Sequence, residues 1–523
     1  MHWPLLVFYH KEPQQSSILT KNLKKCGFFV NKNTFLRSET NFLLIIAIDK
    51  KAVFSYNIVY IVAYRREIDI FYCATAQERQ INMSLKVVKF GGSSLADAQH
   101  FRQVAEIIKA DPDRRYVVPS APGKRFSDDT KVTDLFYTLF ELVRSHASSD
   151  VIDAHYEKIK ERYNSIISEL GLNFDLSGEY EYIKNAILHN SGRDFAASRG
   201  EYLNGLILAK YIGFDFIDAE NVVYFRENGT FDEDKTNDIL SLELKDHKYA
   251  VIPGFYGIAP NGTIVTFSRG GSDITGSIVA RAAEADLYEN WTDVSGFLMA
   301  DPRIISNPQP IDTITYRELR ELSYMGATVL HEDAIFPVRY AGIPINIRNT
   351  NHPEDKGTMI VSQASSYDSE HVITGIAGKK GFSVITIEKD MMNSEIGFGR
   401  KVLECLEDND ISFEHLPSGI DTMSVVVSTA QFEAHKERVL QAITRRTKPD
   451  SISIEDGLAL VAVVGRGMVK AKGTAARVFS AISNAGVNIR MIDQGSCELN
   501  IIVGVEEHDF NTALGAIYNE FVK

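Results

Sequence analysis

Cysteine is scarce in this sequence, with four residues among 523. Cys26, Cys73, Cys405 and Cys497 stand far apart and form none of the close pairs of a metal-binding motif. Small domains held together by disulfides carry more cysteine at closer spacing. The scarcity argues against a disulfide framework and predicts reduced thiols in a cytoplasmic protein.

Long apolar runs and basic clusters are also missing. The apolar runs at 42–48 and 58–63 fall short of the roughly 18 to 20 residues that span a bilayer. The N-terminus lacks the basic start and small-residue cleavage site of a secretory signal. The formal net charge is −13, without the clustered Lys and Arg that bind phosphate backbones. We therefore expect neither a membrane nor a nucleic acid as a partner.

The remaining composition is that of a globular protein, with 44% hydrophobic and 24% charged residues and a length sufficient for three or four domains. From residue 84 to about 365, short β-branched runs alternate with amphipathic helical segments. This alternation predicts an α/β fold with a mainly parallel sheet between helices and with ligands at the carboxyl ends of the strands. The expected strands are 85–90, 116–119, 214–217, 249–252 and 343–347.

Two glycine-rich turns stand where an expected strand gives way to a helix. The first turn, residues 91–94, leads into a helix expected at 96–110. The second turn, residues 266–272, leads into an apolar helical repeat. Glycine lets a backbone approach a ligand closely, and the amides at a helix N-terminus favour anions. The two turns predict sites for two anionic ligands.

An internal repeat follows residue 370. The helical pattern at 399–410 recurs at 475–486, and the segments that follow these helices begin at 411 and 487, 76 residues apart. Each helix is preceded by one expected strand and followed by another. The repeat predicts two small α+β domains in tandem.

Six segments in this order resemble the aspartate kinases of the amino-acid kinase superfamily, and the resemblance covers residues 83–523. They are KFGGSS (89–94), VVPSAPG (117–123), SRGEYLNG (198–205), SRGGSDITG (268–276), WTDVSGFLMADPR (291–303) and GATVLHEDAIFPV (326–338). The resemblance implies an amino-acid kinase catalytic domain at 83–365. It also implies two ferredoxin-like ACT domains, at 371–450 and 451–523, and the monofunctional form of the enzyme.

The activity implied by this resemblance is transfer of the γ-phosphoryl group of ATP, with Mg²⁺, to the β-carboxylate of L-aspartate. The product, 4-phospho-L-aspartate, opens the biosynthesis of lysine, threonine, methionine and isoleucine. Because the acceptor is already an anion at neutral pH, no general base is needed. Catalysis must come from holding two anionic reactants in line and neutralising the charge between them.

The resemblance also implies roles for matching residues. Lys89 would neutralise charge on the transferring phosphoryl group, and Asp273 would orient Lys89 or a Mg²⁺ shell. Arg269 would grip the substrate α-carboxylate through its two-pronged guanidinium, and Glu201 would bind the α-ammonium. Further nucleotide-binding positions are Gly91, Gly92, Ser93, Thr292, Asp293, Leu298 and Arg303, and further substrate-binding positions are Ser120, Thr133, Gly271 and Ser272. No metal site built from protein ligands alone is predicted.

The ACT domains imply feedback regulation by an amino-acid effector, with lysine the first expectation and threonine the second. Glu414 would pair with the effector ammonium. The matching effector positions are Met392, Gly397, Phe398, Gly399, Phe413 and Glu414. Because such sites form between subunits, a homodimer or a dimer of dimers is expected.

Residues 1–82 match nothing in the family. One interpretation is an additional small domain or tail, and the one we favour is that translation begins at Met83.

Two alternative functions also remain open. Another carboxylate kinase of the superfamily is one, and a catalytically silent amino-acid sensor is the other. The sensor is favoured only by Leu298, where many relatives carry Tyr, and by Thr328, where many carry Lys or Glu.

Overall fold

The computed structural model describes Ile45–Ala47, Tyr60–Val62 and residues 85–268, 270–327, 330, 332–363 and 372–522. The chain divides into two compact units, Met1–Met83 and Ser84–Lys523. In the first unit, β1 (Ile45–Ala47) pairs with β2 (Tyr60–Val62) in antiparallel register. Arg269 and Thr328 lie outside the described residues. All other elements described below belong to the second unit.

The second unit contains an eight-stranded sheet with the strand order β10-β12-β11-β9-β3-β4-β6-β5. Every neighbouring pair is parallel except β11 with β12. The strands are β3 (Lys86–Phe90), β4 (Arg114–Pro119), β5 (Asp215–Phe216), β6 (Ala250–Val251), β9 (Leu287–Thr292), β10 (Thr313–Thr315), β11 (Ile345–Asn349) and β12 (Thr358–Val361). A separate hairpin joins β7 (Tyr256–Ile258) to β8 (Ile264–Thr266). The predicted mainly parallel sheet is confirmed.

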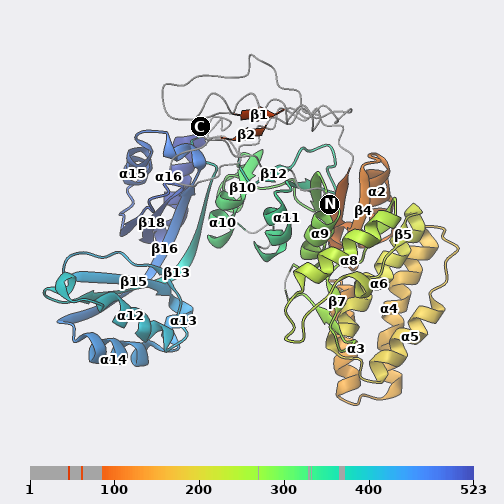
Figure 1. Ribbon diagram of the computed structural model, residues 1–523. Coiled ribbons are helices and arrows are strands. Elements are labelled where there is room, and N and C mark those ends of the chain that lie inside the picture. The colour runs from red at the N-terminus through yellow and green to blue at the C-terminus, as the bar shows by residue number, and fades with distance from the viewer. Residues whose placement is uncertain are drawn as a thin grey trace, which may run out of the picture. The chain divides into compact units, whose positions relative to one another are not determined.

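Helices pack on both faces of this sheet (Figure 1). Residues of β3 alternate between two hydrophobic clusters, because side chains of a strand point to opposite faces in turn. Val87 belongs to the same cluster as Ile278 of α9 (Gly271–Ala282), whereas Val88 belongs to the cluster that contains Phe101 of α2 (Ala98–Lys109). Lys89 therefore points to the face that α9 covers. The helices of this region are α2 (Ala98–Lys109), α3 (Val132–Arg144), α4 (Ser149–Glu169), α5 (Ser177–Leu188), α6 (Arg193–Ile212), α7 (Ala219–Val222), α8 (Glu233–Asp246), α9 (Gly271–Ala282), α10 (Tyr316–Tyr324) and α11 (Phe336–Ala341).

The C-terminal region forms a six-stranded antiparallel sheet with the order β14-β15-β13-β16-β18-β17. Figure 1 shows β13 and β16 as its long strands. The strands are β13 (Gly375–Glu388), β14 (Phe413–His415), β15 (Thr422–Ser428), β16 (Ser451–Val464), β17 (Met491–Asp493) and β18 (Asn500–Glu506). The helices are α12 (Phe398–Glu407), α13 (Thr429–Glu433), α14 (Lys436–Thr447), α15 (Thr474–Asn484) and α16 (Phe510–Val522). The helices and strands expected for each copy of the repeat are present.

The two copies of the repeat exchange strand segments. Residues 382–388 of β13 pair with β15 and with residues 451–458 of β16, whereas residues 375–379 pair with 460–464. Ile452 of β16 accordingly packs against the hydrophobic cluster of α12. The strand pairing thus crosses the predicted boundary between residues 450 and 451. Each repeat unit takes half of β13 and half of β16, because strand pairing and not sequence order assembles the sheet.

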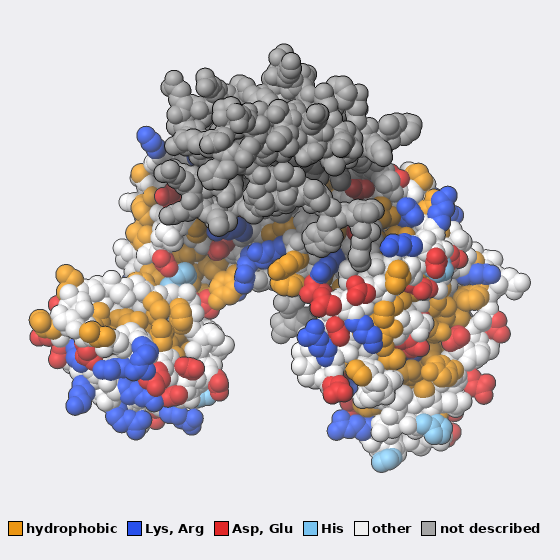
Figure 2. Space-filling model, in the orientation of Figure 1, with side chains coloured by type: hydrophobic (Ala, Val, Ile, Leu, Met, Phe, Trp, Pro, Cys, Tyr) orange, Lys and Arg blue, Asp and Glu red, His pale blue; other side chains and the backbone are white. Residues whose placement is uncertain are grey.

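The surface mixes charges of both signs over most of the visible face in Figure 2. Basic side chains of α14 pair with nearby acids; for example, Lys436 contacts Glu433 at 2.6 Å and Arg446 contacts Asp408 at 2.7 Å. Among the helices in the described part of the chain, none combines the length and the hydrophobicity needed to cross a bilayer.

Candidate active site

The first glycine turn lies at the carboxyl edge of the parallel strands. The Gly91 N–H donates to the carbonyl oxygen of Trp291 at 3.0 Å, and the Gly123 N–H donates to the Gly92 carbonyl at 2.8 Å. A Cβ atom at position 92 would lie 2.7 Å from the carbonyl oxygen of Ala121. Only glycine therefore allows the turns after β3 and β4 to approach this closely. Ser93 is exposed beside this turn.

Lys89, the penultimate residue of β3, reaches the first turn of α9. Its Nζ lies 2.5 Å from Oδ1 of Asp273 and 3.4 Å from Oδ1 of Asn290. The Nδ2 of Asn290 donates to the same Asp273 Oδ1 at 2.8 Å. The Lys89 side chain is 8% exposed, so its ammonium is held in a largely desolvated cluster with one carboxylate and one amide.

The first turn of α9 is built on close backbone approaches. Gly270 caps the helix with φ of 56°, in the left-handed region that favours glycine. A Cβ atom at Gly271 would lie 2.3 Å from Cδ2 of Phe255. A Cβ atom at Gly254 would lie 2.8 Å from Cα of Ser272. No side chain caps the first amides of this helix among the described residues. These N–H groups are suited to an anion, as the sequence predicted. Arg269, which precedes them, lies outside the described residues.

Glu201 is a buried acid on α6. Its Oε2 has no hydrogen-bond partner among the described residues, whereas the backbone N–H of Ala121 donates to its carboxyl group. Burial raises the pKa of Glu201 from 4.5 to about 8. A buried carboxyl group with one oxygen unpartnered among the described residues is suited to a ligand that brings its own positive charge.

The remaining predicted substrate positions surround the loop that follows β4. Ser120 donates its N–H to the carbonyl of Phe90 at 3.1 Å, and its own carbonyl accepts from Nδ2 of Asn204 at 2.6 Å. Thr133 lies, half-buried, in the first turn of α3. The loop contacts the glycine turn on one side and Glu201 on the other, so it joins the predicted phosphate and ammonium sites.

The predicted nucleotide residues Thr292, Asp293, Leu298 and Arg303 lie at the end of β9 and in the partly buried segment that follows it. The Thr292 hydroxyl donates to Oδ1 of Asp293 at 3.1 Å. Leu298 is 38% exposed and forms a β-bridge with Pro310. The Arg303 side chain is 84% exposed and pairs with Asp301 at 2.6 Å. Thr292 and Asp293 adjoin the glycine turn through β9, whereas no contact among the described residues joins Arg303 to Lys89.

Two contributors to this site were missed by the sequence analysis. Asn290 bonds both Lys89 and Asp273. No signal in the sequence marked it, because three of the six residues of β9 are polar. Arg162, which is buried, donates to the Gly123 carbonyl at 2.5 Å and to Asp129 at 2.7 Å, and so fixes the loop opposite the glycine turn. Within the described part of the chain, no three His, Cys, Asp or Glu side chains are grouped to hold a metal ion.

The predicted effector residues lie in two places of the first repeat unit, around the start of α12 and on β14. Met392 and Phe398 are buried in its core, Gly397 caps α12 with φ of 81°, and Gly399 lies in the first turn of that helix. Phe413 of β14 is 45% exposed. Met392 and Phe398 thus share the hydrophobic cluster beside α12, whereas Phe413 lies on β14, the edge strand of the sheet.

Glu414 of β14 contacts the catalytic region. Its Oε2 accepts a hydrogen bond from the hydroxyl of Tyr324, at the end of α10, at 2.6 Å. Partial burial and the Glu414 carboxylate raise the pKa of Tyr324 to about 12. The predicted effector carboxylate is therefore already engaged by a tyrosine from outside the repeat.

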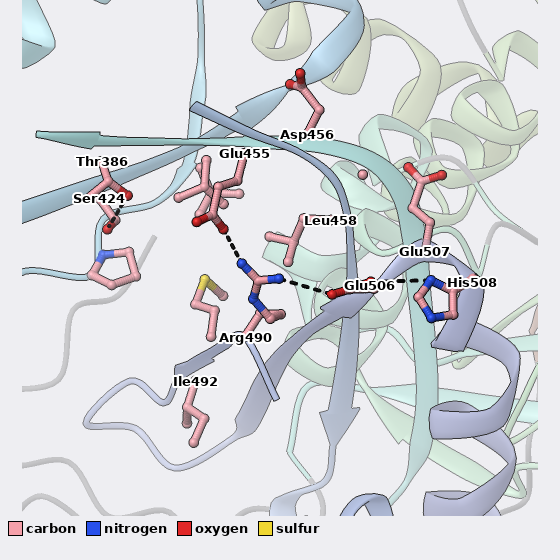
Figure 3. A pocket seen from close by; sticks show the side chains of 15 residues that line it. Thr386, Ser424, Glu455, Asp456, Leu458, Arg490, Ile492, Glu506, Glu507 and His508 are labelled. Carbon is pink, nitrogen blue, oxygen red and sulfur yellow. Dashed lines mark hydrogen bonds and ion pairs between the residues drawn. The ribbon is translucent and has the colours of Figure 1, made fainter. Parts of the chain in front are cut away.

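A cavity of about 1040 Å³ lies on the six-stranded sheet (Figure 3). Arg490 crosses it, forming ion pairs with Glu455 and, at 3.1 Å, with Glu506. The cavity is lined by residues of β13, β15, β16, β17 and β18 and contains none of the predicted catalytic or effector residues.

Comparisons with known proteins agree with this arrangement. The model of the amino acid kinase family matches residues 84–349, and a model of the ACT domain matches residues 461–521. Aspartokinase 3 of Bacillus subtilis is 40% identical over 456 residues, which cover 84% of this chain and 98% of that protein.

Solved structures of aspartate kinases are also similar to this chain. The crystal structure of Clostridium acetobutylicum aspartate kinase is 52% identical with a TM-score of 0.78, and the match covers 84% of this chain and 100% of that one. Aspartokinase III of E. coli, in complex with aspartate and ADP, shares the fold at 24% identity with a TM-score of 0.63, over 83% and 99% of the two chains.

Proposed function

This chain belongs to the amino acid kinase family and, within it, to the aspartokinases. We propose that its site around Lys89 transfers the γ-phosphoryl group of ATP to the β-carboxylate of L-aspartate, giving 4-phospho-L-aspartate. The observation that supports this assignment most directly is the Lys89 ammonium, held 2.5 Å from Asp273 beside the glycine turn.

Phosphoryl transfer to a carboxylate requires positive charge and main-chain hydrogen-bond donors, and it does not require a base. The acceptor carboxylate is ionised at neutral pH, so no proton has to be removed. Lys89 neutralises the negative charge that spreads over the phosphoryl oxygens during transfer. Gly92 and Ser93 supply amides to the phosphates, whereas the Gly91 N–H already donates to the Trp291 carbonyl. Asp273 holds the ammonium in place through its 2.5 Å contact.

Mg²⁺ fits the donor set at Asp273. Both contacts of this carboxylate within the described residues use Oδ1. Mg²⁺ prefers one or two carboxylates together with phosphate oxygens and water, and it does not require a cage of protein ligands. Asp273 would hold the ion with the nucleotide, and the ion would supply further charge neutralisation.

Recognition of aspartate rests on its two ends. Glu201 binds the α-ammonium, because its buried Oε2 lacks a partner in the described residues and needs a cation to become a stable carboxylate. Arg269 binds the α-carboxylate, as the resemblance implies. Together these two groups favour an amino acid over a simple dicarboxylate.

An assay that traps the acyl phosphate with hydroxylamine tests this function. The purified chain, given ATP, Mg²⁺ and L-aspartate, is expected to form aspartyl hydroxamate and to form almost none with L-glutamate. Preference for another carboxylate would favour the rival kinase, and absence of any hydroxamate would favour the silent sensor.

We also propose feedback regulation through the first repeat unit. Glu414 is the partner for the ammonium of an amino-acid effector, with lysine the first candidate and threonine the second. The Tyr324 hydroxyl occupies Glu414 at 2.6 Å, so an effector must displace it. A structure of E. coli aspartokinase III in complex with lysine and aspartate represents a T-state. Because the resemblance implies effector sites between subunits, we expect a homodimer or a dimer of dimers.

Replacing Tyr324 by phenylalanine is expected to make the enzyme more sensitive to its effector. The substitution removes the competing hydroxyl, and a hydrogen bond contributes about 0.5–1.5 kcal/mol net, so the half-inhibitory concentration should fall about two- to tenfold. Activity is measured against lysine and threonine, singly and together.

The control for this experiment is Tyr340→Phe, because Tyr340 is 79% exposed on α11 and contacts the ring of Phe336 rather than the repeat units. A wild-type enzyme that neither amino acid inhibits would disprove the feedback proposal. Equal sensitivity of wild type and Tyr324→Phe would show that the hydroxyl does not compete.

A further inference from the structure

One face of β9 holds the first turn of α9 in place. Tyr288 and Asn290 are two residues apart on this strand, so their side chains share a face. Tyr288 is fully buried, and its hydroxyl donates to the backbone carbonyl of Asp273 at 3.1 Å. Asn290 is 3% exposed, and its Nδ2 donates to the carboxylate of the same Asp273 at 2.8 Å. Backbone and side chain of Asp273 are thus both bonded from β9.

The orientation of the Asn290 amide follows from its partners. The Asp273 carboxylate can only accept a hydrogen bond, so Nδ2 must face it. The amide oxygen is then left for Lys89, whose Nζ lies 3.4 Å away. Lys89 and Asn290 are also direct neighbours in the parallel register of β3 and β9. Asn290 therefore contacts both charged members of the cluster.

α9 packs closely on β9 at Gly276. A Cβ atom at Gly276 would lie 2.3 Å from the Tyr288 hydroxyl oxygen. The helix packs directly on the tyrosine ring because this position is glycine. The first turn of α9 is therefore set at a fixed height above the strand, which places Asp273 within reach of Asn290.

We propose that Asn290 is a positioning residue for phosphoryl transfer, acting through Asp273 and Lys89. This inference rests on the proposed function of Lys89. A lysine side chain has a flexible four-carbon stem, and small misplacements of a catalytic group cost large factors in rate. By fixing the Asp273 carboxylate, Asn290 restricts the ammonium to one direction before the substrates bind.

Replacing Asn290 by leucine is expected to lower kcat about tenfold or more, because two hydrogen bonds to charged groups are lost. KM for ATP and for aspartate should stay within about twofold, because Asn290 acts on the reacting charge and not on substrate binding. Asn290→Ser, which is smaller and polar, serves as a second variant and should show the same separation of kcat from KM. Steady-state kinetics with both substrates measure these changes.

A matched control is Asn346→Leu on β11, the strand next to β9. Asn346 is also buried, at 9% exposed, and its Oδ1 has no partner in the described part of the chain. This control should leave kcat unchanged, which separates loss of a buried amide in general from loss of the contacts to Asp273 and Lys89.

A double-mutant cycle decides whether Asn290 acts through Asp273. In an Asp273→Ala background, Asn290→Leu should cost less than about threefold in kcat, because coupled residues are not additive. The proposal is overturned if Asn290→Leu keeps kcat within about twofold of wild type, or if its loss is equally large in both backgrounds. Failure of the proposed function is a separate result, since it would be seen as normal turnover of Lys89→Met.

Discussion

Replacing Lys89 by methionine is expected to lower kcat by roughly 100- to 1,000-fold while KM for aspartate changes little. Methionine keeps the length of the side chain and removes the ammonium, which lies 2.5 Å from Asp273 in the wild-type chain. The ammonium stabilises charge that develops during transfer, so its loss acts on turnover. ADP release and hydroxamate formation, measured at saturating aspartate and ATP, report kcat directly.

The control is Lys86→Met, which makes the same change three residues earlier on β3. Lys86 begins β3, at the end opposite the glycine turn, and pairs with Asp111 at 2.6 Å. Among the contacts of the described residues, none joins Lys86 to Asp273 or Asn290. This variant should turn over normally. Near-normal kcat in Lys89→Met would rule out the assignment of the site.

The second large effect is expected in the pH dependence of aspartate binding. Burial raises the pKa of Glu201 to about 8, so this group is mostly protonated at neutral pH in the free enzyme. Only its ionised form pairs with an ammonium group. Between pH 6 and 8, kcat/KM for aspartate should therefore rise by up to about tenfold per pH unit and level off above pH 8.

Replacing Glu201 by glutamine is expected to raise KM for aspartate by about 10- to 100-fold, through loss of a charge-assisted hydrogen bond. It should also flatten the pH profile between 6 and 8. Glu179→Gln is the control, because Glu179 accepts a bond from Tyr202 at 3.0 Å and lies outside the predicted substrate positions. A Glu201→Gln enzyme with the wild-type pH profile would contradict the proposed role.

The same pKa predicts a stability effect with the opposite direction. The folded-state pKa of Glu201 lies above its usual value of 4.5, so its contribution to stability is fully present below that pH and is lost as pH rises through about 8. The free wild-type enzyme should therefore lose thermal stability between these limits more than Glu201→Gln does. Melting curves without substrate, recorded from pH 5 to 9, provide this comparison.

Much of the fold followed from local patterns. The strand at 85–90 and the glycine turn after it were predictable, because a buried strand and a tight turn leave strong signals over few residues. The expected strands at 214–217 and 249–252 shorten to two residues each, β5 and β6. Strand ends depend on how far a neighbouring strand extends, and that information is not local.

In the C-terminal region with the six-stranded sheet, local patterns again predicted only part of the structure. Its repeated helices were visible as a recurring apolar pattern, yet the division of β13 and β16 between the two repeat units was not. The contact of Tyr324 with Glu414 joins residues 90 positions apart and left no pattern in the sequence. Contacts of this kind are specified by packing of whole elements.

By itself, the sequence determined which residue types stand in the candidate site: Lys89 shortly before a glycine pair, Asp273 at the start of an expected helix, and Glu201 in the segment SRGEYLNG. Only the tertiary structure decided that Asn290 bridges Lys89 and Asp273 and that Glu201 is buried enough to hold a proton at neutral pH. The physical reason is that a side chain's hydrogen bonds and its exposure to water depend on neighbours distant in the sequence, which are brought into contact only by folding.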